Sequence, residues 1–556
     1  MTAGPHGAAI SDLNQINAYG KSIQLNMEAI MQQSAGRFNA NRLFVGALFL
    51  YAVIFTFNLN GQTLTLPLHF DFGTGAAEPG FVKVTPATLY NSKSALGYGW
   101  DSAAEITAVS RTGSDTLLDD YCTSTEPFSF SIKLPLGSYK ATVYIGDLTA
   151  AAITSVYGEQ RRLFVDRLST AAGQFATKTF TIYRRDYKYD NITISRTTRE
   201  LTYEDLDSNL TFIFSGAHPA VCGLDVAKAD TSVITLYVCG NSTTVDQPAE
   251  PFCSWPQMIT RMFTPQVVVA DYAESGLTAA SFIAQNRLKM ISALVKPGDY
   301  IFAEFGHNDQ KDSTDSINYP SNLKVYRDSA RAHGAIPVFV TPTARLAEND
   351  STTSIGGLAQ MCRVAAKADS VKLIDLNSMV IALHKSIGTN VQAMYADPTT
   401  HFTDYGAFEL ARCVATGPEG MGAIGLGIAQ YLNNDLPVFN PADPDPLNYL
   451  TTPTVGILEP GLSSVQKNSS DEGGFSVNIA AHTIRFNPGK TGAVVFSVYS
   501  LSGKCLAEKR TVVAQTQGLL TWQELGKLPR GIFLLTMNVN NSIVGKIRLC
   551  TLLSQQ

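Results

Sequence analysis

The chain has 556 residues, with 42 Lys and Arg against 47 Asp and Glu and a formal net charge of −5. A chain of this length exceeds one ordinary hydrophobic core and is expected to divide into about three domains. This weakly acidic charge lacks the basic footprint that phosphate backbones require, so nucleic acid is excluded as the expected partner. Hydrophobic residues make up 45% of the chain and charged residues only 16%, which is typical of β-rich, exported proteins.

The first 61 residues contain an almost wholly apolar stretch, Leu43–Phe57, that follows two arginines. The stretch is too short for a comfortable membrane span and has the features of a signal-peptide core behind a basic segment. A start at Met27 or Met31 would give a signal of ordinary length, and the mature chain would begin near Gln62. The alternative is a signal anchor that stays in the membrane. Either interpretation predicts a secreted or cell-surface protein of the bacterial type, with membrane contact only through this segment.

The eight cysteines lie at positions 122, 222, 239, 253, 362, 413, 505 and 550 and include no CxxC pair. A zinc ribbon or thioredoxin-type motif is therefore not expected, and we predict neither a metal nor a cofactor. Cys122 with Cys222, and Cys505 with Cys550, could form disulfides in an oxidising compartment. Buried free thiols are the equally weighted alternative.

Residues 62–232 alternate apolar and polar positions without a long amphipathic helix, which favours a β-sandwich. The alternating segments around Pro135–Gly137 predict a β-hairpin with one buried face. The strings His69-Phe-Asp-Phe-Gly73 and Gly97-Tyr-Gly-Trp100 resemble the galactose-binding-like sandwich that precedes some bacterial carbohydrate esterases. Flat aromatic faces bind sugar rings, so exposed side chains in this region would be candidate sugar contacts, with the core as the alternative. The candidates are Tyr90, Tyr98 and Trp100.

Residues 233–437 alternate strand-like and helix-like stretches, which predicts an α/β domain with a doubly wound, mostly parallel sheet. The expected strands are Val233–Cys239, Val267–Val269, Tyr300–Phe305, Pro337–Val340 and Val371–Leu376. The expected helices span 278–295, 318–333, 357–369 and 404–415.

Residues 438–472 are rich in Pro, Ser and Asn and predict a linker. Residues 473–556 alternate again and predict a small, Ig-like C-terminal β-sandwich. The order of its segments, with Val498-Tyr-Ser-Leu-Ser-Gly-Lys504, Trp522 and Gly531-Ile-Phe-Leu-Leu535, resembles the sorting domains of the type IX secretion pathway. That resemblance implies secretion machinery as a partner; a structural or sugar-binding sandwich is the alternative.

Ser242 follows the first strand of the α/β domain, two residues after Gly240, at the sheet edge where ligands bind in such folds. A serine nucleophile needs a base, a group that orients the base, and donors for a tetrahedral oxyanion. His401 is the candidate base, and Asp397 is the candidate orienting carboxylate. The candidate donors to the oxyanion are the Ser242 N–H, the Gly276 N–H and the Asn308 side-chain amide, each of which follows a predicted strand.

The four segments that contain Ser242, Gly276, Asn308 and the Asp397/His401 pair occur in the order of the sequence blocks of the SGNH hydrolases, also called the GDSL esterases. The longer strings in and around these segments resemble the rhamnogalacturonan acetylesterase branch of that family. The strings are Gly240-Asn-Ser-Thr-Thr-Val-Asp-Gln247, Ser254-Trp-Pro-Gln257, Tyr272-Ala-Glu-Ser-Gly276, Lys296-Pro-Gly-Asp299, Phe305-Gly-His-Asn-Asp-Gln-Lys311 and His401-Phe-Thr-Asp-Tyr-Gly-Ala407. The resemblance implies a serine esterase that removes acetyl groups from plant cell-wall polysaccharide, most directly the rhamnogalacturonan of pectin, through an acetyl-Ser242 intermediate.

The chain departs from the family pattern in two places. Asn241 replaces the usual Asp, but an Asn keeps an acceptor oxygen for a local turn. Asp397 precedes His401 by four residues, where the family has three. The loop either bulges and keeps the contact or leaves a Ser-His dyad. Acetylxylan or another glycan is an alternative substrate, and a polysaccharide-binding surface protein with a decayed esterase domain is the alternative of a different class.

Overall fold

The computed structural model describes residues 64–90, 96–102, 105–203, 206–349, 351, 353–422, 425–436 and 439–445, and seven strands between 474 and 551. The predicted signal segment and most of the predicted linker lie outside these residues. Within the described part of the chain, no helix combines the length and the apolar character needed to cross a membrane.

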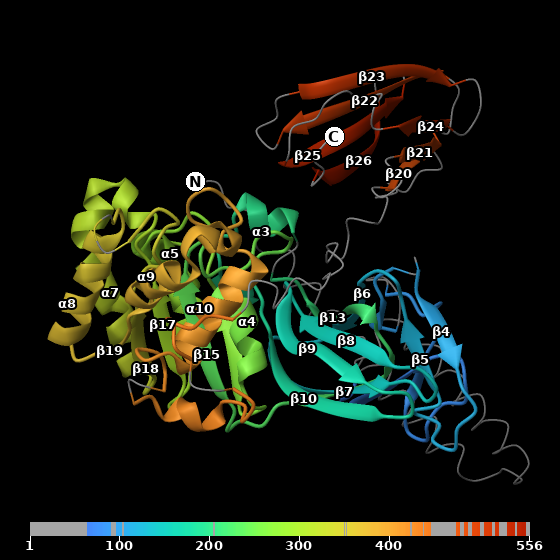
Figure 1. The fold of residues 1–556 in the computed structure, drawn as a ribbon, viewed down its shortest axis with the longest axis horizontal. Helices are drawn as coiled ribbons and strands as arrows, with labels where there is room; N and C mark the ends of the chain where they lie inside the picture. The colour runs from blue at the N-terminus through green and yellow to red at the C-terminus, as the bar shows by residue number, and fades with distance from the viewer. Residues whose placement is uncertain are drawn as a thin grey trace, which may run out of the picture. The chain divides into compact units, whose positions relative to one another are not determined.

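Two β-sheets form the N-terminal part (Figure 1). One contains β1 (Leu68–Phe72), β2 (Val82–Val84), β4 (Thr107–Ser110), β5 (Asp120–Thr123), β7 (Gly137–Gly146), β10 (Phe175–Arg184) and β14 (Val221–Lys228). The other contains β3 (Tyr98–Trp100), β6 (Phe128–Lys133), β8 (Ala152–Gly158), β9 (Arg162–Thr170) and β13 (Asn209–His218). A single apolar core takes side chains from both sheets, which is the packing of a β-sandwich.

Two predictions for the sandwich are wrong. The segments around Pro135–Gly137 do not form a hairpin, because β6 pairs with β3 and β13 while β7 pairs with β10 and β14 of the other sheet. Both strands bury their apolar positions in the same core, so the alternation alone does not reveal that they face each other. Trp100 is not a sugar contact, because it is fully buried in that core and its Nε1 donates to the Thr85 carbonyl (3.2 Å).

Cys122 and Cys222 are buried free thiols. Val221, rather than Cys222, is opposite Cys122 in the sheet. Neighbouring residues of a strand point to opposite faces, so the two sulfur atoms lie on different sides of the sheet. The other predicted pair, Cys505 and Cys550, has side chains that lie outside the described residues.

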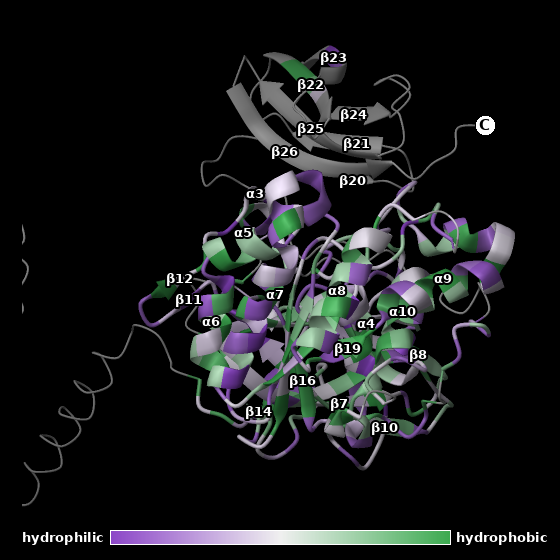
Figure 2. Ribbon diagram, turned by 90° about the vertical axis from the view of Figure 1, so that its left-hand side faces the viewer, coloured by the Kyte–Doolittle hydropathy of each residue, from purple (hydrophilic) through white to green (hydrophobic). Residues whose placement is uncertain are grey.

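Five parallel strands form the sheet of the next part, in the order β16-β15-β17-β18-β19. They are β15 (Ile234–Gly240), β16 (Val267–Asp271), β17 (Tyr300–Glu304), β18 (Ile336–Val340) and β19 (Lys372–Ile374). The near-continuous burial of β15, β16 and β17 is typical of a parallel sheet that is covered on both faces, and Figure 2 shows hydrophobic residues along β16.

Helices cover both faces of this sheet. Buried side chains of α5 (Ala279–Ala284), α6 (Arg287–Leu294), α7 (Ser313–Ala332) and α8 (Gly356–Ala368) share one core. Those of α4 (Trp255–Ile259), α9 (Leu376–Ile387) and α10 (Asp404–Thr416) share the other. Short 3-10 turns span Thr260–Met262, Asp309–Lys311, Gly388–Met394 and Gly427–Tyr431.

The helix predictions differ from the structure in two respects. The stretch 278–295 is two helices rather than one, because Asn286 adopts a left-handed conformation (φ 63°) between α5 and α6. Asn tolerates this conformation better than most residues, so it serves as a break. The helices α4 and α9 have no counterpart among the predicted elements; α4 has only five residues, and α9 begins where the last predicted strand was expected to end.

The sandwich and the α/β part share their apolar cores. One α/β core includes the sandwich residues Tyr157, Leu163 and Ile213. The other includes Tyr183, Ile192, Ile194 and Leu206. The last three come from a segment of the sandwich chain that contains β11 (Lys188–Tyr189), β12 (Ile192–Thr193) and α3 (Thr198–Thr202). The two parts therefore pack as one continuous structure.

The last described strands form two antiparallel sheets, as expected of a small sandwich. Three strands, β20 (Gly474–Asn478), β21 (Thr483–Asn487) and β24 (Gly518–Thr521), form one sheet. Four strands, β22 (Gly492–Ser500), β23 (Cys505–Val513), β25 (Gly531–Val539) and β26 (Ser542–Thr551), form the other.

Candidate active site

Ser242 lies in the tight turn that follows β15, between β16 and β17 in the parallel sheet. Gly240, the last residue of β15, is opposite Glu304 of β17. A Cβ at Gly240 would overlap the Thr244 hydroxyl and lie 2.9 Å from the Glu304 carbonyl oxygen. A glycine is therefore required at this position, because the Thr244 side chain and the main chain of β17 leave no room for a Cβ.

Asn241 holds the turn from inside. Its side-chain oxygen accepts hydrogen bonds from the Thr243 N–H (3.1 Å) and the Thr243 hydroxyl (3.0 Å). This is an Asx turn, so the Asn that departs from the family pattern keeps the function expected of it. The Gln247 amide donates to the Ser242 carbonyl (3.1 Å), which fixes the main chain on the other side of the serine.

A buried carboxylate supports the turn from below. Glu304 lies 3.1 Å from the Thr243 hydroxyl oxygen and accepts a hydrogen bond from the Trp255 indole N–H (2.7 Å). Burial raises the pKa of Glu304 to about 7, against the opposing effect of these two contacts. Neither Glu304 nor Trp255 is among the predicted site residues, because their sequence positions give no sign of this contact.

His401 bridges Ser242 and Asp397. Its Nε2 lies 2.8 Å from the Ser242 hydroxyl oxygen, and its Nδ1 is in hydrogen-bond contact with the Asp397 carboxylate. The structure thus brings together the three residues expected to act as nucleophile, base and orienting group. The Phe252 ring packs edge-on against the imidazole (centroids 5.9 Å apart).

The extra residue between Asp397 and His401 is accommodated by a compact loop. One oxygen of Asp397 accepts hydrogen bonds from the main-chain N–H groups of Thr399 (2.8 Å), Thr400 (2.6 Å) and His401 (3.3 Å). The Ala396 N–H closes the loop on the His401 carbonyl (2.7 Å). The chain therefore folds around the carboxylate and returns the imidazole to its other oxygen.

These contacts keep Asp397 ionised. Burial by itself raises the pKa of Asp397, but the hydrogen bonds from Thr400, His401 and Thr399 outweigh burial and lower the pKa to about 2. A carboxylate ion at Nδ1 holds the proton there and leaves Nε2 as the acceptor that faces Ser242.

Gly276 occupies the third position of the turn Glu274–Leu277, which is closed by the Leu277 N–H and the Glu274 carbonyl (3.4 Å). Its φ of +82° is the conformation that a type II turn requires at this position. A Cβ built on Gly276 would meet no atom of the described residues within 4 Å. The space beside the turn is therefore open to a ligand.

Asn308 is joined to the same turn, since its side-chain N–H₂ donates to the Leu277 carbonyl (3.1 Å) and retains a second hydrogen. The Lys311 ammonium donates to the Asn308 side-chain oxygen (2.7 Å), which fixes the orientation of the amide.

Asp309 accepts hydrogen bonds from the Gly306 and Ala279 N–H groups (both 2.9 Å), and burial raises the pKa of the Asp309 carboxyl to about 6.

His307 braces the end of this strand. Its Nε2 lies 2.9 Å from the Thr343 carbonyl, and burial lowers the pKa of its imidazole to about 3. His307 is therefore neutral at physiological pH and braces the loop that carries Asn308.

The site also includes residues of the sandwich that sequence reasoning missed. Arginines from this part of the chain form ion pairs with Asp246, Glu274 and Asp404, each of which lies within four residues of Ser242, Gly276 or His401. These contacts span at least 75 positions in the sequence, and no local pattern reveals them.

A serine hydroxyl, an imidazole and a carboxylate in this chain of hydrogen bonds, at the carboxyl edge of a parallel sheet, define the serine-hydrolase class of α/β proteins. Among the described residues, no group of three or more His, Cys, Asp or Glu side chains is arranged to hold a metal ion.

Residues 238–407 match the model of the GDSL-like lipase/acylhydrolase family. Residues 68–203 match the galactose-binding-like domain of the β-agarase/YXIM esterase-like group. Rhamnogalacturonan acetylesterase RhgT of Bacillus subtilis is 31% identical over 211 residues, which cover 34% of this chain and 91% of RhgT. The chain belongs to the GDSL-like lipase/acylhydrolase family.

Two further relatives extend the comparison. The uncharacterized esterase YxiM of B. subtilis is 25% identical over 377 residues, covering 64% of this chain and 92% of YxiM. The solved structure of YxiM aligns with 65% of this chain and 99% of its own length at 24% identity, with a TM-score of 0.35. The acetylxylan esterase Axe2 of Geobacillus stearothermophilus aligns with 35% of this chain and 97% of its own length at 15% identity, with a TM-score of 0.28.

Proposed function

We propose that the protein is a serine esterase that removes acetyl groups from plant cell-wall polysaccharide through an acetyl-Ser242 intermediate. The observation that carries the proposal is the hydrogen-bonded chain from Ser242 through His401 to Asp397. In acylation, the Ser242 oxygen attacks the acetyl carbonyl while His401 Nε2 takes its proton. Collapse of the tetrahedral intermediate expels the sugar oxygen, which takes this proton from His401.

The negative oxygen of the intermediate is held by the N–H groups of Ser242 and Gly276 and by the Asn308 amide. Each donor of this type contributes about 100-fold or more to turnover. Water then enters, His401 removes its proton, and hydrolysis of acetyl-Ser242 releases acetate. Asp397 holds the imidazole in the same tautomer through both steps.

Rhamnogalacturonan is the substrate that we propose first. RhgT and the probable rhamnogalacturonan acetylesterase YesY of B. subtilis, 27% identical over 203 residues, support this choice by name. Galacturonate makes this polymer anionic, and the chain itself carries a net charge of −5, so the two repel each other. The cationic side chains of Lys311 and Arg345 would offset this repulsion locally. Acetylated xylan is the alternative substrate within the same chemistry.

Ser242→Ala tests the proposal. We expect the wild-type chain to release acetate from acetylated rhamnogalacturonan faster than from acetylxylan, and the variant to release it at least about 1,000-fold more slowly. Ser232→Ala, at an exposed serine before β15, is the control and should retain activity. Equal rates for the Ser242 variant and the wild type would refute the esterase assignment, whereas a preference for acetylxylan would refute only the substrate.

A decayed esterase is less well supported as the alternative, because the Asp397 loop accommodates the long Asp397-to-His401 spacing that favoured this alternative.

We further propose export to the cell surface or beyond, supported by the apolar stretch at 43–57 and by a polymeric substrate that does not enter cells. Fractionation of the native host with an antibody to the chain tests export; retention in the cytoplasm would refute it.

A further inference from the structure

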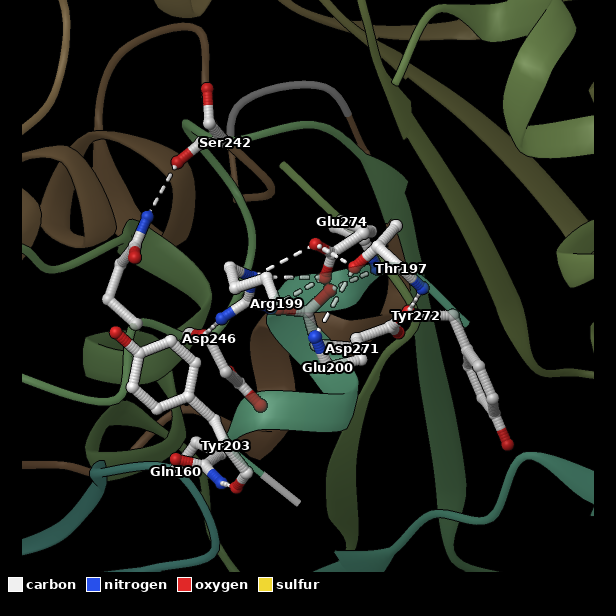
Figure 3. A network of polar contacts seen from close by, with 12 residues as sticks. Gln160, Thr197, Arg199, Glu200, Tyr203, Ser242, Asp246, Asp271, Tyr272 and Glu274 are labelled. Carbon is white, nitrogen blue, oxygen red and sulfur yellow. Dashed lines mark hydrogen bonds and ion pairs between the residues drawn. The ribbon is translucent and has the colours of Figure 1, made fainter. Parts of the chain in front are cut away.

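A short segment of the sandwich chain lies against the loops of the site (Figure 3). It contains α3, whose N-terminus is closed by a capping box between Thr197 and Glu200. The buried Glu200 forms an ion pair with Arg287 of α6 (2.6 Å), and the Ser195 N–H donates to the Gln285 carbonyl (3.1 Å). The segment is thus held firmly on the α/β part.

Arg199, the second residue of α3, reaches from this segment to Glu274. Its Nη2 and Nε lie 2.6 and 2.9 Å from the two carboxylate oxygens, which is a bidentate pair. The Thr197 hydroxyl donates to the same carboxylate (2.8 Å). The Glu274 side chain is only 1% exposed, so Arg199 and Thr197 bind a carboxylate that is almost completely shielded from water.

Glu274 is the first residue of the turn whose third residue is Gly276. Its main chain is also tied to the nucleophile, because the Glu274 N–H donates to the Gly240 carbonyl (3.3 Å). Fixing the Glu274 side chain therefore fixes the direction of the Gly276 N–H relative to Ser242. Arg199 also donates to the Asp246 carbonyl (3.3 Å), on the other side of the nucleophile turn.

We propose that Arg199 is a positioning residue for the esterase: from the sandwich, it fixes the Glu274–Leu277 turn that presents the Gly276 N–H to the oxyanion. The proposal rests on the proposed function of the site. It assigns the sandwich a part in catalysis, in addition to any binding of sugar.

The charge of Arg199 matters as well as its shape. Without the guanidinium, a nearly buried carboxylate would be left unbalanced two residues from an oxyanion donor. An unpaired buried charge is costly, and a negative charge here would also oppose the negative oxygen of the intermediate. A change at Arg199 should therefore raise the barrier of the chemical step more than it weakens substrate binding.

Other arginines of the sandwich act on the remaining loops. Arg162 pairs with Asp246 (2.7 Å), four residues after Ser242, and both side chains are buried. Arg161 Nη2 lies 2.9 and 3.1 Å from the two carboxylate oxygens of Asp404, three residues after His401. Each of three site loops is thus held by an arginine from the sandwich, and Arg199 is the one tied to the oxyanion turn.

The test uses the full chain with Arg199→Ala, Arg199→Lys, Glu274→Gln and the double variant R199A/E274Q. Turnover of 4-nitrophenyl acetate is measured, and active sites are counted by end-point titration with a fluorophosphonate. For Arg199→Ala we expect kcat per titrated site to fall about 10- to 100-fold with KM changed less than about threefold. Arg199→Lys should lie between this variant and the wild type. The double variant should recover part of the loss, because it removes the unbalanced charge.

Arg196→Ala is the matched control, since Arg196 belongs to the same segment and its guanidinium stacks on the Tyr187 ring (3.8 Å). A merely structural role of Arg199 would lower the number of titrated sites and leave kcat per site unchanged, and that result would overturn the proposal. An equal loss in the Arg196 control would also overturn it. If Arg199→Ala does not fold, the Arg199→Lys and Glu274→Gln variants decide the question by the same measurement.

Ser242→Ala is assayed in parallel to separate the two proposals. If Ser242→Ala is inactive while every Arg199 variant matches the wild type, only the positioning role fails. If Ser242→Ala remains active, the proposed function itself fails.

Discussion

Asp397 has a separate task for each of its carboxylate oxygens. One accepts the main-chain hydrogen bonds that close the loop, and the other faces His401 Nδ1. Asn at this position would keep the first oxygen and replace the second with an N–H₂ donor. That donor would favour the tautomer of His401 that carries its proton on Nε2, facing Ser242, so the imidazole could no longer accept the serine proton.

We therefore expect Asp397→Asn to lower kcat about 1,000-fold or more while the loop and the stability of the fold are retained. Acetate release and thermal unfolding are the measurements. The exposed Asp443, changed to Asn, is the control and should leave both unchanged. Activity within tenfold of the wild type would show that the Ser-His pair works without Asp397.

Glu304 predicts a dependence of stability on pH. Its pKa in the folded chain, about 7, lies above the ordinary value of 4.5 for a glutamate, so folding favours its protonated form. The contribution of Glu304 to stability is complete below pH 4.5 and is lost as the pH rises through 7. Glu304→Gln removes this dependence, since Gln does not titrate.

The free energy of unfolding of Glu304→Gln, relative to the wild type, should therefore rise by roughly 2 to 4 kcal/mol between pH 4.5 and pH 8. Denaturant unfolding at both pH values measures it. Glu105→Gln, at an exposed position, is the control. A difference that is constant with pH would mean that Glu304 folds as a carboxylate ion.

At the level of the elements, strand ends were the most predictable part of the site. Runs of apolar residues mark β15, β16 and β17, and parallel strands meet at one edge, so Ser242, Gly276 and Asn308 could be brought together from the sequence. The pairing of β6 and β7 could not, because two strands that face each other across a core have the same alternation as a hairpin. The Arg199–Glu274 ion pair could not be predicted either, since the sequence does not show how the sandwich and the α/β part pack against each other.

At the level of the whole molecule, the sandwich and the α/β part depend on each other. They share two apolar cores, and buried or nearly buried side chains of the α/β part, such as Asp246 and Glu274, find their cations in the sandwich. RhgT aligns over 91% of its length with only 211 residues of this chain, so it has little length left for a domain of this size. The alignment with YxiM, in contrast, extends over 377 residues, which is longer than the α/β part alone.

We expect a chain reduced to residues 233–445 to be insoluble or to unfold well below the temperature at which residues 64–445 unfold. Removing one partner of a buried ion pair costs about 3 to 5 kcal/mol, and the excision removes the partners of several acids together with part of two cores. Since the net stability of a domain is about 5 to 15 kcal/mol, losses of this size are enough to unfold it.

Soluble yield, thermal unfolding and turnover of 4-nitrophenyl acetate are compared for residues 64–445, 233–445 and 64–556. The chain that ends at Asp445 keeps the Arg412–Asp445 ion pair (2.7 Å) and should match the longer one in kcat. A soluble 233–445 fragment with full activity would contradict both this expectation and the positioning role of Arg199.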